Sequence, residues 1–171
     1  MRASLVDYWR LPLKFPERVF TEEEVRRARE IIEEGYKHRL QVKGSPQFKK
    51  DVKEALKQIK TAGYYDFLRT YIRQIVEIEG FSQLHEADSA IWANTPMLVD
   101  RVDAASYMVQ KAQQMKDYIE GKLYYGTGEA TAMQKRVEFL EVLKKKSRNR
   151  HVKDRCKELL KKWSESKFQF P

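Results

Sequence analysis

The residues best suited to chemistry are cations crowded between positions 144 and 151. Six of these eight positions hold Lys, Arg or His, and no acidic residue interrupts the run. The six are Lys144, Lys145, Lys146, Arg148, Arg150 and His151. Flexible cations gathered on one face bind backbone phosphates without reading the bases. These six residues, here named the junction cluster, together with Lys153 therefore predict a binding site for the backbone of RNA or DNA.

Lysines also recur at helical spacing in two further stretches. One ladder is Lys49, Lys53, Lys57 and Lys60, and the other is Lys153, Lys157 and Lys161. Each lysine follows an apolar residue by one position, which is about 100° around a helix. Lysines beside an apolar stripe commonly cover the core edge with their stems and leave only the ammonium in water. We therefore expect both ladders to be chiefly solvated faces, with Lys53 and Lys57 as secondary contributors to phosphate binding.

A different chemistry centres on His85 and Asp88. On a helix these residues would be neighbours three positions apart, and a carboxylate beside an imidazole raises its basicity, as in a general base. The alternative is that these are solvated polar residues at a helix end, because acidic side chains are favoured in the first turn of a helix. The sequence leans away from an enzyme, since no nucleophile accompanies an identified base. An enzyme built on this pair is therefore the third hypothesis.

The sequence lacks the motifs of several common metal-binding and nucleotide-binding sites. There is no His-Glu-x-x-His motif, no Glu three positions before a histidine and no phosphate-binding P-loop. One cysteine and three scattered histidines make a weak zinc set. Cys156 falls on an apolar stripe, as an inert buried thiol does, and the stretch Gly126-Thr127-Gly128 indicates a turn between helices. We therefore expect neither a metal nor an organic cofactor.

The charge of the 171-residue chain is unevenly distributed. Its formal net charge is +9, of which residues 35–73 hold +7 and residues 135–167 hold +8. Residues 74–134, which lie between these two basic blocks, hold a net −5. Such asymmetry favours either an anionic partner or pairing of the blocks with one another.

A protein–protein interaction module or structural subunit is the second hypothesis. Residues 1–20 predict an extended arm rich in aromatic residues, in which two prolines disfavour helix, and the tail at 165–171 carries Phe168 and Phe170. Aromatic residues are enriched at protein interfaces, and charge blocks of opposite sign permit head-to-tail self-association. The same arm and tail would equally close the ends of a helical core.

Four helices are expected in the first half of the chain to position these residues. Apolar residues recur there at helical spacing between turn residues, in the ranges 21–40, 46–62, 64–79 and 82–93. Ser45 as cap and Pro46 at the first position open the second of these helices, and Gly63 ends it.

Three further helices are expected in the second half. The longest runs from Pro96 to Tyr125, and its apolar residues form a heptad-like seam with alternating steps of four and three. The seam consists of Leu98, Val102, Ala105, Val109, Ala112, Met115 and Ile119. The next helix ends at a break over 147–149, and the last helix begins after that break with an apolar stripe that includes Val152 and Cys156.

These elements define the predicted fold class. Because no segment alternates with period two over a useful length, we predict an all-α fold in one domain covering residues 1–171. Its architecture would be a six- to seven-helix bundle or short helical stack with an extended N-terminal arm. No apolar run reaches the length of about 18 residues that a membrane span needs, and a single cysteine fits a reducing compartment, so we expect a cytoplasmic protein without membrane contact.

The leading functional hypothesis is a non-enzymatic helical module that binds nucleic acid, either alone or as a subunit of a larger assembly. Its partner would be RNA, DNA or another anionic macromolecule, and a protein partner or homo-oligomer belongs to the second hypothesis. The predicted binding residues are Lys144, Lys145, Lys146, Arg148, Arg150 and Lys153, with Lys53 and Lys57 secondary.

Overall fold

The computed structural model describes residues 21–34, 39–122, 124 and 126–166. The expected arm at 1–20 and residues 167–171 of the expected tail lie outside the described residues. The described helices are α2 (Glu22–Glu34), α3 (Pro46–Ala62), α4 (Tyr65–Tyr71), α5 (Arg101–Ile119), α6 (Glu129–Lys146) and α7 (Arg150–Ser166). The strands are β1 (Gln41–Lys43), β2 (Gln74–Glu77), β3 (Gln83–His85) and β4 (Ala90–Ala93).

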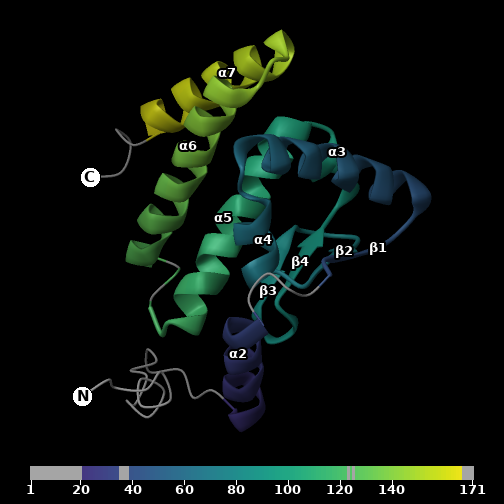
Figure 1. Ribbon diagram of the computed structural model, residues 1–171, viewed down its shortest axis with the longest axis vertical. Helices are drawn as coiled ribbons and strands as arrows, with labels where there is room; N and C mark the ends of the chain where they lie inside the picture. The colour runs from purple at the N-terminus through teal and green to yellow at the C-terminus, as the bar shows by residue number, and fades with distance from the viewer. Residues whose placement is uncertain (1–20, 35–38, 123, 125, 167–171) are drawn as a thin grey trace.

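A four-stranded mixed sheet shows that the all-α prediction is wrong. The strand order is β1-β2-β4-β3, with β1–β2 and β2–β4 parallel and β3 antiparallel to β4 at the edge. In this register Ile75 of β2 faces Val42 on one side and Ile91 on the other. The chain therefore forms neither a six- to seven-helix bundle nor a helical stack, because helices pack around a sheet (Figure 1).

The helix predicted over 64–79 is half correct. α4 ends at Tyr71, and the next residue, Ile72, already has extended backbone angles of φ −115° and ψ 122°. The chain then enters β2, in which Ile75 is fully buried. The apolar residues of β2, Ile75 and Val76, are adjacent, so the strand does not alternate between apolar and polar residues. Its short apolar run consequently matched the spacing of a helix.

The helix predicted over 82–93 is also wrong. Residues 83–85 and 90–93 form the antiparallel pair β3–β4, and a single 3-10 turn (η2, Glu86–Asp88) joins the two strands. Ser89 completes the turn with a φ of 50°, in the left-handed region that residues other than glycine rarely adopt. The polar stretch before β4 is therefore a tight hairpin turn.

The predicted start and end of α3 are confirmed. Ser45 caps the helix by accepting a hydrogen bond from the Phe48 amide, Pro46 occupies the first position, and Gly63 ends the helix with a φ of 80°. From β2, the Glu77 carboxylate accepts hydrogen bonds from the Ser45 amide at 2.6 Å and hydroxyl at 3.2 Å. The sheet thus fixes the start of α3, which later carries part of the candidate site.

α5 lies at the centre of the molecule, with α6 on one side and the sheet and α4 on the other (Figure 1). The predicted seam is buried along its whole length, since each of its seven residues is at most 3% exposed. The helix is shorter than predicted. A 3-10 turn (η3, Thr95–Leu98) precedes it, and Asp100 caps it by accepting hydrogen bonds from the amides of Val102 and Asp103.

The remaining helix ends agree only in part with the bounds predicted from turn residues. The first helix is described as α2 from Glu22 to Glu34, and it does not reach Leu40 as predicted, because Leu40 lies buried outside any helix just before β1. The break at 147–149 is confirmed, and Asn149 caps α7 by accepting a hydrogen bond from the Val152 amide at 3.2 Å. Gly126–Gly128 forms a short 3-10 turn (η4) before α6.

Within the described residues, no helix combines the length and apolar character needed to cross a membrane.

Candidate functional site

An open groove of about 510 Å³ lies between α3 and the junction of α6 with α7. Four cationic side chains line it, and they come from separate parts of the chain: Lys57, Arg101, Lys146 and Arg148. The other lining residues are Glu54, Gln58, Thr61, Ser147, Asn149 and Val152. The groove therefore brings residues of both basic blocks to one surface.

Helix ends position three of these cations. Arg101 is the first residue of α5, Lys146 is the last residue of α6, and Arg148 lies in the three-residue connection to α7. Lys146 Nζ lies 3.4 Å from the carbonyl oxygen of Ala62 at the end of α3, to which it donates a hydrogen bond. A cation is favourable there because the last carbonyls of a helix carry partial negative charge.

One carboxylate orients two of the cations. Lys57 Nζ donates a hydrogen bond of 2.6 Å to Glu54, and Arg101 lies 3.8 Å from the other oxygen of that carboxylate. The hydrogen bond from Lys57 is the main reason that the pKa of Glu54 lies below its ordinary value. Glu54 is therefore ionised at neutral pH, and the lining still carries more positive than negative charge.

The start of α7 adds a second source of positive potential. Asn149, which lines the groove, is the residue that caps this helix. The first amides of an α-helix point outward without helical partners and carry partial positive charge. An anion in the groove would therefore meet the N-terminal end of α7 as well as the four side-chain cations.

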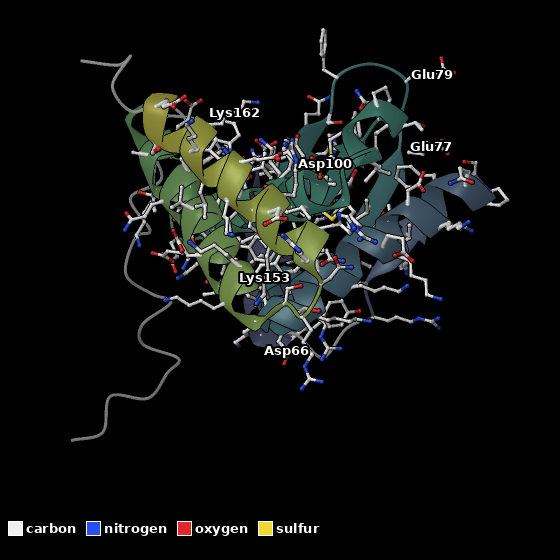
Figure 2. The ribbon with its side chains drawn as sticks, turned by 90° about the horizontal axis from the view of Figure 1, so that it is seen from above. Asp66, Glu77, Glu79, Asp100, Lys153 and Lys162 are labelled. Carbon is white, nitrogen blue, oxygen red and sulfur yellow. The ribbon has the colours of Figure 1, made fainter. Side chains whose placement is uncertain are left out.

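The structure separates the predicted binding residues into two groups. Lys57, Lys146 and Arg148 line the groove, whereas Lys53, Lys145 and Arg150 are exposed outside its lining and Lys153 is half-buried on α7 (Figure 2). The sequence shows no acidic residue within the junction cluster and suggested that its cations are unpaired, but two of them pair with carboxylates outside the run. Lys144 lies 2.7 Å from Glu141, and Arg150 lies 3.8 Å from Asp154.

Sequence reasoning missed Arg101 and Gln58. Arg101 belongs to the acidic middle of the chain, where its charge is outnumbered, and Gln58 is an uncharged residue on a helix rich in lysine. Only the packing of α3 against α5 and α6 brings them together. No local signal in the sequence marks either residue.

His85 and Asp88 are close in space although no helix holds them. His85 Nδ1 lies 3.0 Å from Asp88 Oδ2, and the imidazole stacks on the Trp92 ring with centroids 4.1 Å apart. The other Asp88 oxygen accepts a hydrogen bond from Arg27, which also donates to the Ala87 carbonyl. These contacts hold the β3–β4 turn against α2. A cavity of about 200 Å³ beside Asp88 has Arg27 and Arg73 in its lining but not His85.

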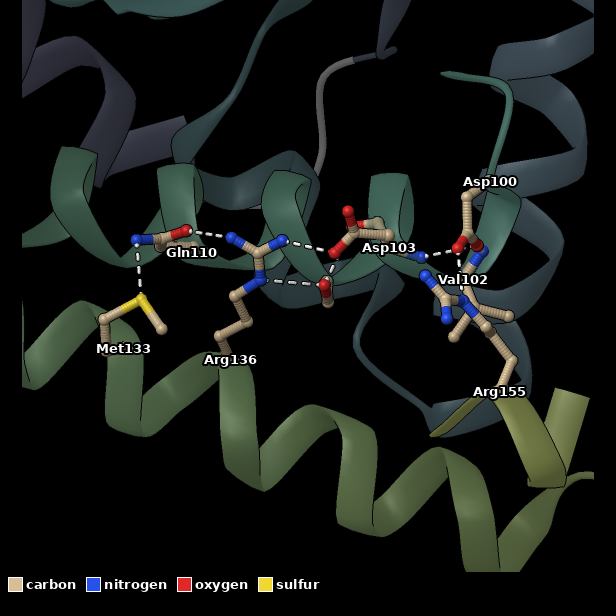
Figure 3. A network of polar contacts seen from close by, with 8 residues as sticks. Asp100, Val102, Asp103, Gln110, Met133, Arg136 and Arg155 are labelled. Carbon is tan, nitrogen blue, oxygen red and sulfur yellow. Dashed lines mark hydrogen bonds and ion pairs between the residues drawn. The ribbon is translucent and has the colours of Figure 1, made fainter. Parts of the chain in front are cut away.

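The acidic middle pairs with the 135–167 basic block and with α2 inside the chain. Arg136 of α6 donates hydrogen bonds to Asp103, Ser106 and Gln110 of α5, as Figure 3 shows. In the same view Arg155 of α7 reaches the cap residue Asp100. Arg136 and Arg155 of the 135–167 block therefore serve the packing of α6 and α7 on α5.

Cys156 lies within the core at 0% exposed, and burial raises the pKa of its thiol to about 11. Among the described residues, no three His, Cys, Asp or Glu side chains gather as a metal site would require.

Comparison with known proteins gives no relative for this arrangement. No family model, no curated protein sequence and no solved structure matches the chain.

Proposed function

We propose that this protein is a non-enzymatic module that binds the phosphate backbone of nucleic acid in the groove between α3 and the α6–α7 junction. The observation that carries the proposal is the convergence of Lys57, Arg101, Lys146 and Arg148 on one concave surface. Convergence of cations on a concave surface raises the local concentration of anions. Each cation that neutralises a backbone phosphate releases counterions from the nucleic acid and so contributes to affinity.

The composition of the groove favours binding without sequence preference. Among the described residues that line it there is no aromatic side chain on which a base would stack. Single-stranded nucleic acid is held by stacking where aromatics are present and by backbone charge where they are absent. The groove therefore suits contacts to phosphate and sugar, with the bases directed outward.

A protein partner is the second candidate, and one observation favours it. Phe81 is 93% exposed and Val99 is 85% exposed, which is unusual for large apolar side chains. Asn94 steadies the loop that carries Phe81 by donating a hydrogen bond to the carbonyl oxygen of Gly80. The opposite charge blocks give this candidate less support, because Asp103 and Asp100 of the acidic middle already pair within the chain with Arg136 and Arg155.

The proposal is tested by fluorescence anisotropy with a labelled 12-nucleotide single strand at several salt concentrations. Four phosphate contacts predict that log K falls against log salt with a slope of about −3. The double variant Lys57→Gln/Arg148→Gln should bind about tenfold more weakly at 50 mM salt and show a slope of about −1.5.

A charge-matched control is the double variant Lys49→Gln/Lys161→Gln, which removes two exposed lysines outside the groove. It should retain most of the affinity. Absence of binding at low salt, or an equal loss in the control, would show that the groove is not a phosphate site. Circular dichroism of each variant verifies that the fold is retained.

A further inference from the structure

A second cavity, with a volume of about 440 Å³, lies between the C-terminal half of α5 and the N-terminal part of α6. None of its lining residues lines the basic groove. Every residue in its described lining is polar or charged, and two of them, Gln113 and Asp117, are themselves buried. Walls of this kind offer hydrogen bonds in many directions and therefore suit a small polar molecule.

Asp117 has a carboxylate oxygen without a partner. The residue is 2% exposed, and its Oδ1 accepts a hydrogen bond of 2.9 Å from the Gln113 amide nitrogen. Its Oδ2 is closed off from water and has no hydrogen-bond partner among the described residues. Such a group calls for an explanation, because almost all buried polar groups in native folds are satisfied. Asp117 lines the cavity and the last torsion of an aspartate is soft, so its carboxylate can turn to a donor bound there.

The lysines that line this cavity pair with carboxylates other than that of Asp117. The pairs are Lys116 and Lys122 with Glu120, at 3.8 and 2.6 Å, and Lys135 with Glu138, at 3.0 Å. The donor that Asp117 lacks would therefore come from a bound molecule. An ammonium group fits best, because a hydrogen bond that involves ionised groups is about twice as strong as one between neutral groups.

The charges around the cavity indicate a ligand that carries both signs. Three lysines and two carboxylates, those of Asp117 and Glu138, are in the described lining. A metal ion or a purely cationic molecule beside Asp117 would be repelled by the lysines. A carboxylate on the ligand offsets this repulsion, and a lysine ammonium has three N–H donors with which to hold both it and a glutamate. Lys135 is the better placed lysine, because its side chain is 29% exposed against 65% for Lys122 and its charge is less screened by water.

The remaining groups in the described lining are uncharged. Gln113, Thr131 and Gln134 present amide and hydroxyl groups, which both donate and accept hydrogen bonds. A ligand side chain with an amide or hydroxyl of its own would pair with them, whereas an aliphatic one would gain nothing from them. The volume of about 440 Å³ lies within the roughly 300–1,000 Å³ of small-molecule sites, so it accommodates such a ligand.

We propose that this cavity binds a free α-amino acid with a polar, uncharged side chain, whose ammonium group pairs with the Asp117 carboxylate and whose carboxylate pairs with Lys135. The site is separate from the basic groove and does not depend on phosphate binding. A binding role accounts for a buried carboxylate that destabilises the fold, since proteins keep such local conflicts chiefly where function needs them.

Calorimetric titration tests the ligand class with three probes that share one side chain. L-glutamine carries both charged groups, L-glutaminamide lacks the carboxylate, and N-acetyl-L-glutamine lacks the ammonium. The protein should bind L-glutamine at least about tenfold more tightly than either analogue, because each analogue loses one hydrogen bond between ionised groups. L-asparagine and L-serine extend the titration to shorter polar side chains.

Two variants test the residues. Asp117→Asn keeps the shape of the side chain but removes its charge, so affinity for L-glutamine should fall at least about tenfold. Lys135→Gln should weaken binding of L-glutamine but not of L-glutaminamide, which has no carboxylate for Lys135 to hold. The matched control Asp66→Asn removes an exposed carboxylate outside the cavity and should bind L-glutamine as the unmodified protein does.

Three results would overturn the proposal. The first is no binding of L-glutamine, L-asparagine or L-serine at millimolar concentrations, and the second is equal affinity for L-glutamine and its two analogues. The third is an equal loss of binding in Asp117→Asn and Asp66→Asn. The analogues require no change to the protein, so they test the proposal even if a variant does not fold. The titrations contain no nucleic acid, so their outcome is independent of the function proposed for the basic groove.

Discussion

The contact between Arg136 and Asp103 should dominate the docking of α6 on α5. The Arg136 side chain is 8% exposed and lies 2.6 Å from Asp103, whose side chain is 36% exposed. Arg136 also lies 4.6 Å from the centroid of the Trp163 ring on α7. Replacing Asp103 with Asn keeps the shape and one acceptor oxygen, but it leaves a buried guanidinium without its countercharge.

The expected loss follows from this geometry. Removing one partner of a fully buried ion pair costs about 3–5 kcal/mol. Asp103 is partly solvated, and Arg136 keeps its hydrogen bonds to Ser106 and Gln110, so the cost should lie below that range. We expect Asp103→Asn to lower the free energy of unfolding by about 2 kcal/mol, which corresponds to roughly 4–8 °C in Tm for a chain of this size.

Urea unfolding followed by circular dichroism, together with calorimetry, measures this loss. The matched control is Asp66→Asn, which removes an exposed carboxylate paired with Arg69 at 2.7 Å and should cost less than about 0.5 kcal/mol. The loss in Asp103→Asn should also persist at 1 M salt, because a buried pair is weakly screened. Equal stability of the two variants would refute the reasoning that this network holds α6 on α5.

Two further predictions concern buried titratable groups. Asp117 is 2% exposed and one of its oxygens has no partner among the described residues, so burial raises its pKa. Its ionised form destabilises the fold at neutral pH, and this penalty fades as the pH falls through the raised pKa. Asp117→Asn should therefore add about 1 kcal/mol of stability at pH 7 and nothing at pH 3, as measured by urea unfolding. Cys156 is 0% exposed and burial raises the pKa of its thiol to about 11, so thiol labelling at pH 8 should be at least about 100-fold slower in the folded than in the unfolded chain.

The sequence predicted those elements whose boundaries are set by local chemistry. Ser45, Pro46 and Gly63 fix α3 through interactions within a few residues, and Asn149 does the same at the start of α7. The strands could not be found in this way. β2 is four residues long, and what makes it a strand is pairing with β1 and β4, which depends on contacts far along the chain.

The residues of the candidate site also divide into those that the sequence indicated and those that only the tertiary structure identifies. Lys57, Lys146 and Arg148 stood out in the sequence because they belong to dense runs of cations. Arg101 and Gln58 did not, because their role comes from the packing of α3, α5 and α6 around the groove. Charge density along a chain identifies candidates, whereas the tertiary fold decides which of them share a surface.

Internal pairing decides where positive charge is left for a partner. Arg136 and Arg155 belong to the strongly basic 135–167 block, yet Asp103 and Asp100 engage them at the contacts of α5 with α6 and α7. The groove differs, because four cations line it and Glu54 is the one carboxylate among its described lining residues. An anionic partner would therefore be drawn to this surface, where cations outnumber carboxylates.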